Sequence, residues 1–382
     1  MFSEEVMLQS CGDDRYRIED TSEIITPGVV VFLDVVKSNI DNMLSIAKGA
    51  NRLRPHCKTH KMKEIVELQI AAGITKHKCA TFAESEMVVA AGAKDVVLAY
   101  NMVGPNIART VAFRQQYPDV KFAVTADHAR PITQLSEQMA AAGQTVDVLL
   151  DLDTGQHRTG IAPGAEAAAL YKQIVELPGI NAAGFHVYDG QNHQTDYDER
   201  KEAVAAVWDS VQELRAAIEG NGQTVPNIVC GGTGSFPAYA AIDDPVVELS
   251  PGTCVFHDAG YGGMFPDLPF TPASLLLTRV ISRPTSDRVT FDLGYKAVAS
   301  DPPAGVRVTF PDLADANLVL QNEEHLVVET SQAEQFTPGD EILAVPRHAC
   351  PTSALHRQVF VVSEGKLVDR WDVASRDRWL NI

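Results

Sequence analysis

Residues 146–176 read VDVLLDLDTGQHRTGIAPGAEAAALYKQIVE, and they contain the unit from which the fold is predicted. Val146–Leu152 is an apolar run of strand length, whereas Ala165–Glu176 has the apolar spacing of a helix. A polar turn with glycines lies between them. A strand followed by a turn and a helix is the repeating unit of sheets with parallel strands.

The same alternation recurs along the first two thirds of the chain. Apolar runs rich in β-forming residues lie at Val29–Asp34, Arg52–Cys57, His77–Phe82, Val96–Tyr100, Lys121–Thr125, Val146–Leu152, Ala182–Val187, Asn227–Cys230 and Val246–Leu249. Helical spacing is found between them, for example at Asn39–Lys48, Met62–Ala72, Glu84–Ala91, Ile132–Ala142, Ala165–Glu176 and Glu202–Glu219. This pattern predicts a closed (β/α)8 barrel of the TIM type rather than an open doubly wound sheet. The chain has nine candidate strands, whereas the barrel has eight. We therefore expect the first or the last candidate strand to lie outside the barrel.

Helical spacing ends after Pro251–Gly252, and short strands separated by Pro, Gly and Asp turns take its place. These strands are predicted at Leu275–Ile281, Val289–Leu293, Leu318–Leu320, Leu326–Glu329, Glu341–Val345, Gln358–Ser363 and Lys366–Trp371. We therefore expect a barrel over residues 23–255 and an all-β domain over residues 256–382, which residues 1–22 join.

Composition limits the classes of function. The chain has 382 residues and a net charge of −18, which argues against nucleic acid or an anionic membrane surface as a partner. No apolar stretch is long enough for a membrane span, and the acidic, polar N-terminus lacks the features of a secretory signal. The six cysteines form no CxxC pair, which favours reduced thiols. We expect a cytoplasmic enzyme with a small-molecule substrate.

In such a barrel the active site lies at the carboxyl ends of the strands. Lys58 follows the second run, in a segment that also contains Arg52, Arg54, Lys61 and Lys63. Because neighbouring positive charges disfavour a protonated amine, Lys58 is predicted to be nucleophilic toward an aldehyde, which would be pyridoxal phosphate. The alternative is a basic loop at the start of a helix.

Two further strand ends carry polar side chains. Arg158 lies in the turn after Val146–Leu152, where its permanent positive charge can face an anion. Tyr188 and His193 follow Ala182–Val187; the tyrosine can hold a ring, and the histidine can act as a general base. An exposed turn and an ordinary polar loop are the alternatives for these two stretches.

The run Gly231, Gly232, Thr233, Gly234 and Ser235 follows the strand predicted near residue 230. Because the three glycines have no side chains, backbone N–H groups of the run can converge on a phosphate. The hydroxyls of Thr233 and Ser235 add two further donors. A tight turn is the alternative. The run is neither a Walker loop nor the dinucleotide fingerprint, because neither GKS or GKT nor GxGxxG is present there.

The fifth candidate site lies in the β-domain. In an extended strand His348 and Cys350 would project from the same face, as two ligands of a borderline metal such as zinc. Two protein ligands leave positions open for water or a substrate hydroxyl. The alternative is a half-buried strand with a hydrogen-bonded histidine and a core cysteine.

The motifs RPHCKTHK around Lys58, DTGQHRTG around Arg158, GGTGS at 231–235 and HAC at 348–350 together resemble one family. This is the D-threonine aldolase and D-serine dehydratase group of alanine-racemase-like (fold type III) pyridoxal phosphate enzymes. The resemblance implies that Lys58 forms the Schiff base, that Arg158 lies near the phenolic oxygen of the cofactor and that the GGTGS backbone holds its phosphate. It also implies a homodimer in which His348 and Cys350 bind one divalent ion (Zn, Mn or Mg) beside the β-hydroxyl of the substrate.

Two reactions on a D-3-hydroxy-amino acid follow from the resemblance. In the first, a base such as His193 takes the hydroxyl proton and retro-aldol cleavage gives glycine and an aldehyde. In the second, Lys58 removes the α-proton and water is eliminated, which gives a 2-oxo acid and ammonia.

Cys350 resembles the dehydratases, whereas Tyr188–His193, Gln321–His325 and Asp258–Asp267 resemble the aldolases, although His193 stands one residue closer to Tyr188 than its counterpart there. We favour cleavage. A racemase, which has no use for the metal, and a non-catalytic cofactor carrier, which would consist of the barrel alone, are the alternatives.

Overall fold

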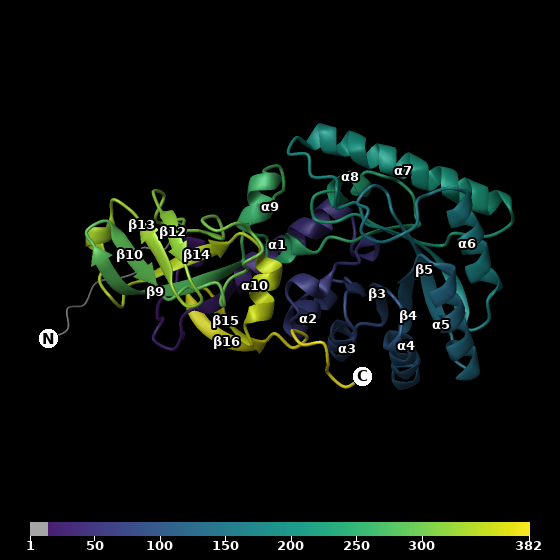
Figure 1. Cartoon of the computed structure of the whole chain (residues 1–382), viewed down its shortest axis with the longest axis horizontal. Coiled ribbons are helices and arrows are strands. Elements are labelled where there is room, and N and C mark those ends of the chain that lie inside the picture. Colours follow the sequence, from purple (N-terminus) through teal and green to yellow (C-terminus); the bar gives the residue numbers. More distant parts are fainter. Residues whose placement is uncertain (1–13) are drawn as a thin grey trace. The chain divides into compact units, whose positions relative to one another are not determined.

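The computed structural model describes residues 14–382, and these form two compact units (Figure 1). The first, which we call the barrel unit, comprises residues 43–58, 63–252 and 377–382. The second, which we call the β unit, comprises the described residues up to 42 together with residues 59–62 and 253–376.

The barrel unit contains a parallel sheet whose seven strands follow one another in chain order. They are β2 (Lys76–Cys79), β3 (Asp95–Asn101), β4 (Lys121–Ala126), β5 (Val146–Leu152), β6 (Ile180–Val187), β7 (Ile228–Cys230) and β8 (Val247–Leu249). Residues 53–56 take the eighth place, because Leu53 bridges Leu249 of β8 and His56 bridges Lys78 of β2, both in parallel. The predicted TIM-type (β/α)8 barrel is confirmed.

Helices follow the strands and cover the outside of the sheet (Figure 1). They are α2 (Lys63–Ala71), α3 (Phe82–Ala90), α4 (Pro105–Gln116), α5 (Ala129–Ala141), α6 (Ala165–Glu176), α7 (Tyr197–Gly220) and the short α8 (Phe236–Ala240). Side-chain caps fix where some of them begin: Thr81 accepts the backbone N–H of Glu84 in α3, and Asp196 accepts that of Glu199 in α7. This alternation places all carboxyl strand ends at one edge of the barrel.

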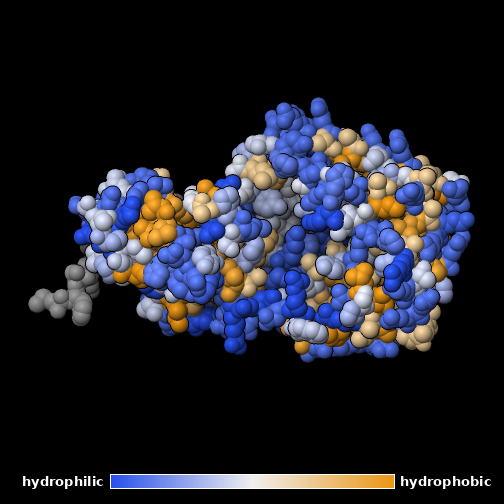
Figure 2. Space-filling view, in the orientation of Figure 1, coloured by the Kyte–Doolittle hydropathy of each residue, from blue (hydrophilic) through white to orange (hydrophobic). Residues whose placement is uncertain are grey.

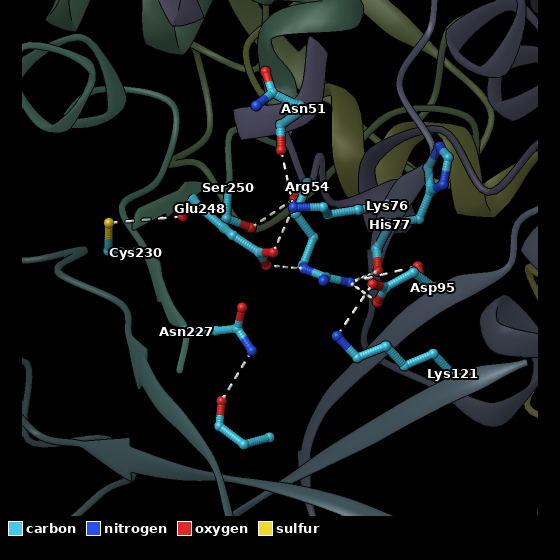
Figure 3. A network of polar contacts seen from close by, with 11 residues as sticks. Asn51, Arg54, Lys76, His77, Asp95, Lys121, Asn227, Cys230, Glu248 and Ser250 are labelled. Carbon is cyan, nitrogen blue, oxygen red and sulfur yellow. Dashed lines mark hydrogen bonds and ion pairs between the residues drawn. The ribbon is translucent and has the colours of Figure 1, made fainter. Parts of the chain in front are cut away.

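Arg54 fills the opposite end of the barrel, where the strands begin (Figure 3). Arg54 is 2% exposed, and its guanidinium donates to Glu248 at 2.6 Å and to Asp95 at 2.8 Å. Lys76 donates to the other oxygen of Glu248 at 2.7 Å. Burial raises the pKa of Glu248, but the attraction of Arg54 and Lys76 outweighs burial, so the pKa lies below the ordinary glutamate value.

We expect Glu248→Gln to lower the free energy of unfolding by about 3–5 kcal/mol, because it leaves the buried Arg54 without a main counter-charge. The contribution of Glu248 is complete above the unfolded-state pKa of glutamate and is lost as pH falls through the lowered folded-state value, so the two proteins should converge in acid. Urea unfolding at neutral and acidic pH measures both effects. The control is Glu176→Gln, which breaks the exposed ion pair with Lys172 and should change the free energy of unfolding little. A loss of stability in Glu248→Gln no larger than in Glu176→Gln would contradict the prediction.

The β unit is mainly antiparallel, with strand order β12-β13-β10-β9-β1-β15-β16, while β14 pairs with β9 and β11. The strands are β1 (Gly28–Phe32), β9 (Ser274–Thr285), β10 (Arg288–Phe291), β11 (Val308–Thr309), β12 (Asn317–Gln321), β13 (Leu326–Glu329), β14 (Glu341–Pro346), β15 (Gln358–Ser363) and β16 (Lys366–Asp372). Helices α9 (Ala259–Met264) and α10 (Ala349–Leu355) interrupt them. Helix α1 (Leu33–Ala47) runs from the β unit into the barrel unit.

The barrel predicted over residues 23–255 includes the residues of β1, but this strand belongs to the β unit. It pairs in parallel with β15 and antiparallel with β9, so the first of the nine runs is the one outside the barrel. All five of its residues are buried, as expected for a central strand. Residues 1–22 are the segment predicted to join the β-domain. Residues 1–13 lie outside the described part of the chain. Within the described part of the segment, Tyr16 donates a hydrogen bond to the carbonyl of Pro272 in the β unit.

One face of the molecule shows how polar and apolar side chains are distributed. The face shown in Figure 2 is mostly hydrophilic, with apolar side chains in scattered patches. Among the residues that the structure describes, no helix has the length and apolar content that a membrane span requires.

Candidate active site

Three cations face the ring of Tyr188 at the carboxyl end of the barrel. The Nζ atoms of Lys58 and Lys78 lie 5.7 and 5.8 Å from the ring centroid, and Cζ of Arg158 lies 4.8 Å from it. Tyr188 directly follows β6, Arg158 lies in the turn after β5, and Lys58 follows residues 53–56 in a short 3-10 turn. The structure thus brings together three residues predicted from sequence and adds Lys78.

None of these basic side chains forms an ion pair within residues 14–382, although the carboxylate of Asp151 attracts Lys78 and Arg158. Lys58, Lys78 and Arg158 form no ion pair there, although the chain carries a net charge of −18. A cluster of unpaired cations attracts anions, and the barrel walls strengthen that attraction by excluding water. The arrangement is therefore suited to an anionic ligand.

Three of the basic residues near Lys58 in sequence have partners of their own. Arg54 pairs with Glu248, Arg52 donates to backbone carbonyls that include Ala240, and Lys63 pairs with Glu67. Their effect on the amine of Lys58 stays a prediction. The second lysine at the Tyr188 ring, Lys78, comes from strand β2.

Lys78 lies in β2 and was missed because the run from His77 to Phe82 is otherwise a buried strand. It pairs in register with Val97, which belongs to the buried cluster that β3 to β7 share, so Lys78 projects toward the barrel interior. Its side chain is 2% exposed, and burial, followed by the charge of Lys58, lowers its pKa to about 7. A lysine inside a buried strand was the signal that could have found it.

A second missed pair lies beside this cluster. His186 in β6 and Asp151 in β5 are both buried, and Nδ1 of His186 is 2.7 Å from Oδ1 of Asp151. Burial lowers the pKa of His186 despite the carboxylate. Its Nε2 is buried and has no hydrogen-bond partner among residues 14–382.

The glycine loop after β7 packs against Tyr188. A Cβ on Gly232 would lie 3.0 Å from the Tyr188 ring, and Gly231 has a φ of 78°, which favours glycine. Both positions therefore require the missing side chain. The loop can approach a ligand beside the ring with its backbone.

The hydroxyls of the loop have partners within the protein. Ser235 donates to Asp189 at 2.7 Å and accepts the backbone N–H of Gly232, and Thr233 accepts that of Gly252. The backbone N–H groups of Gly234 and Ser235 form no hydrogen bond with any described residue. The backbone N–H groups of Gly234 and Ser235 are therefore available for the predicted phosphate contacts.

His193, the predicted general base, lies in the loop between β6 and α7. Its side chain is exposed, and no hydrogen bond or ion pair joins it to another described residue. The structure does not bring His193 together with the cations around Tyr188.

In the β unit, His348 and Cys350 are not part of an extended strand as predicted. Strand β14 ends at Pro346, and helix α10 begins at Ala349, whose N–H donates to the buried Asp258 at 2.9 Å. The two side chains remain close enough for Cys350 to favour the protonated form of His348. Burial lowers the pKa of His348, but the interactions with Cys350 and Asp301 outweigh it and raise the pKa to about 9.

The surroundings of this pair fit a metal site. Nδ1 of His348 lies 2.6 Å from Asp301, the arrangement that usually orients a metal-binding histidine through its other nitrogen. Sγ of Cys350 lies 3.2 Å from the hydroxyl of Thr59, the residue that follows Lys58 in the chain. Imidazole and thiolate together suit zinc among the divalent ions.

Comparisons with known proteins identify the family. Residues 31–259 match the family "Alanine racemase, N-terminal domain", and residues 273–362 match "Putative serine dehydratase domain". The D-threonine aldolase of Arthrobacter sp is 32% identical over 96% of this chain and 94% of its own. The D-threo-3-hydroxyaspartate dehydratase of Delftia sp. (strain HT23) is 26% identical over 91% of this chain and 96% of its own.

Among solved structures, the D-threonine aldolase of Filomicrobium marinum superposes with a TM-score of 0.85 at 31% identity, covering 93% of this chain and 96% of that one. The chain belongs to the alanine-racemase-like enzymes, in the group of D-threonine aldolases and D-serine dehydratases. It is a pyridoxal-phosphate-dependent lyase of the aldolase or dehydratase kind.

Proposed function

We propose that the enzyme cleaves D-3-hydroxy-amino acids to glycine and an aldehyde, with pyridoxal phosphate and one divalent ion as cofactors. The observation that carries the proposal is the cluster of Lys58, Lys78 and Arg158 around Tyr188, which form no ion pair among the described residues. The reaction is the one for which the relative with 32% identity is named.

The residues of the barrel unit fit the organic cofactor. Lys58 would bind its aldehyde, Arg158 would face its phenolic oxygen, and the N–H groups of Gly234 and Ser235 would donate to its phosphate. Tyr188 would hold the ring. When bound, the cofactor withdraws electrons from the α-carbon of the substrate.

The residues of the β unit fit the metal. His348 and Cys350 would hold one ion, with zinc, manganese and magnesium as the candidates, and the ion supplies Lewis acidity at the β-hydroxyl. We retain His193 as the base for the hydroxyl proton, because its exposed ring has no partner in the described chain. A homodimer is also proposed, and light scattering measures it.

Dehydration is the second candidate, because Cys350 stands where the resemblance assigns a carboxylate to the aldolases. Incubating the pure protein with D-threonine, D-serine and 3-hydroxyaspartate separates the candidates. Glycine with an aldehyde supports cleavage, whereas ammonia with a 2-oxo acid supports dehydration. Appearance of the L-amino acid without either pair would establish a racemase.

We expect Gly232→Ala to weaken retention of pyridoxal phosphate on the order of 10- to 100-fold, because the new Cβ displaces the Tyr188 ring at an overpacking cost of about 1–3 kcal/mol. Equilibrium dialysis measures the retention. The control is Gly220→Ala, at the end of α7, where the added Cβ has open space. Equal retention by the two variants would count against this role of the loop.

A further inference from the structure

Arg200 in α7 is a fully buried arginine that reaches the glycine loop after β7. It is 0% exposed, and its guanidinium lies against the ring of Tyr197, with Cζ 5.4 Å from the ring centroid. Nε of Arg200 donates to the backbone carbonyl of Gly234 at 2.9 Å. The side chain thus contacts the loop whose backbone would hold the phosphate of the cofactor.

Further contacts hold the guanidinium of Arg200 in place. Its Nη1 donates to the carbonyls of Gln194 at 2.7 Å and Thr195 at 3.3 Å, both in the loop between β6 and α7. The donors of a guanidinium lie in one rigid plane, so bonds at Nη1 also restrict the direction in which Nε points. The carbonyl of Gly234 therefore accepts from a donor whose direction is fixed by other parts of the protein.

The bond to Gly234 determines the direction of the next N–H group in the chain. The carbonyl of Gly234 and the N–H of Ser235 belong to one peptide unit, which is planar and trans. In a trans peptide the carbonyl and the N–H point in opposite directions. A carbonyl held toward Arg200 therefore directs the N–H of Ser235 away from Arg200.

The N–H of Ser235 is suited to a bound anion. It forms no hydrogen bond with any residue from 14 to 382. The side chain of Ser235 is held as well, because its hydroxyl donates to Asp189 at 2.7 Å and accepts the N–H of Gly232 at 3.0 Å. A backbone N–H that has a fixed direction and no partner in the described chain can donate to an oxygen of a phosphate.

We propose that Arg200 is a positioning residue for the cofactor phosphate, because it holds the carbonyl of Gly234 so that the N–H of Ser235 donates to a phosphate oxygen. This inference rests on the proposed function, because it takes the glycine loop as the phosphate site. Arg200 acts through the backbone of the loop. Its loss should therefore weaken binding of a ligand that has a phosphate group and leave binding of the same ligand without phosphate unchanged.

Pyridoxal and pyridoxal phosphate differ only in the phosphate group and provide the test. Each is titrated into cofactor-free protein, and binding is followed by visible absorption. We expect Arg200→Lys to lower the preference for pyridoxal phosphate over pyridoxal on the order of 10- to 100-fold, because the phosphate loses one charge-assisted hydrogen bond. A lysine keeps the positive charge but lacks the planar fork that fixes the peptide. Arg200→Met, which has no donor, should lower the preference at least as far.

The control is Arg215→Lys on the same helix, where the guanidinium pairs with Asp244 at 2.6 Å and Glu219 at 3.0 Å. This variant should keep the wild-type preference. If Arg200→Lys weakens binding of both ligands equally, or keeps the preference of Arg215→Lys, the inference is overturned while the proposed function stands. A wild-type protein that binds pyridoxal as tightly as pyridoxal phosphate would defeat the phosphate site of the proposed function itself.

Discussion

Lys58→Ala will lower turnover of D-3-hydroxy-amino acids by a factor on the order of 10⁴ or more, because no other residue of the site can take over covalent binding of the cofactor. Lys78 faces the same ring, but it projects from β2 inside the barrel. The variant should also lose the visible absorption of bound cofactor on dialysis. Product formation and absorption after dialysis are the two measurements.

The matched control is Lys172→Ala, which removes an exposed lysine of the same unit that pairs with Glu176. It should retain wild-type turnover and absorption. Turnover in Lys58→Ala within tenfold of this control would mean that another amine carries the reaction, and Lys78 would then be the first residue to test.

His348→Ala will lower turnover on the order of 10²- to 10⁴-fold, since a Lewis acid contributes several kcal/mol to the transition state. The variant should bind pyridoxal phosphate normally, because the cations around Tyr188 lie in the barrel unit. Zinc content after dialysis and turnover with added metal are the measurements. Wild-type protein treated with a chelator should show the same loss and recover when metal returns.

Asp301 provides a graded comparison. Asp301→Asn keeps the size of the side chain that holds Nδ1 of His348 but removes its charge, so metal affinity should fall on the order of 10- to 100-fold. Full turnover of chelator-treated wild-type protein would contradict any role for a metal. Wild-type affinity in Asp301→Asn would contradict only the orienting contact.

The parts of this molecule that sequence predicts are those set by local periodicity. Val146–Leu152 and Ala165–Glu176 form β5 and α6 with the predicted bounds, and repetition of such units defines the barrel. Since parallel strands end at one edge, Lys58 and Arg158 could also be placed together from their positions after strands.

The rest depends on contacts between distant residues. Nothing local in β1 indicates that Val30 pairs with Leu275 and Phe360 rather than with a barrel strand. The turn from β14 into α10 depends on Asp258, which lies far from His348 in sequence.

The partners of the basic residues near Lys58 are also remote in the chain. The partners of Arg54 are Glu248 and Asp95, both remote in the chain, so a basic segment in sequence became a paired network in space (Figure 3). The amine that faces the Tyr188 ring together with Lys58 is Lys78, whose direction into the barrel only the strand register reveals.

The central claim is that an anionic aldehyde cofactor binds among the cations around Tyr188 and is attached to Lys58. The most direct measurement is borohydride reduction of the wild-type protein loaded with pyridoxal phosphate, followed by mass spectrometry of its peptides. We predict one cofactor label per chain, on Lys58. A label on another lysine, or none on a protein that cleaves its substrate, would contradict the account.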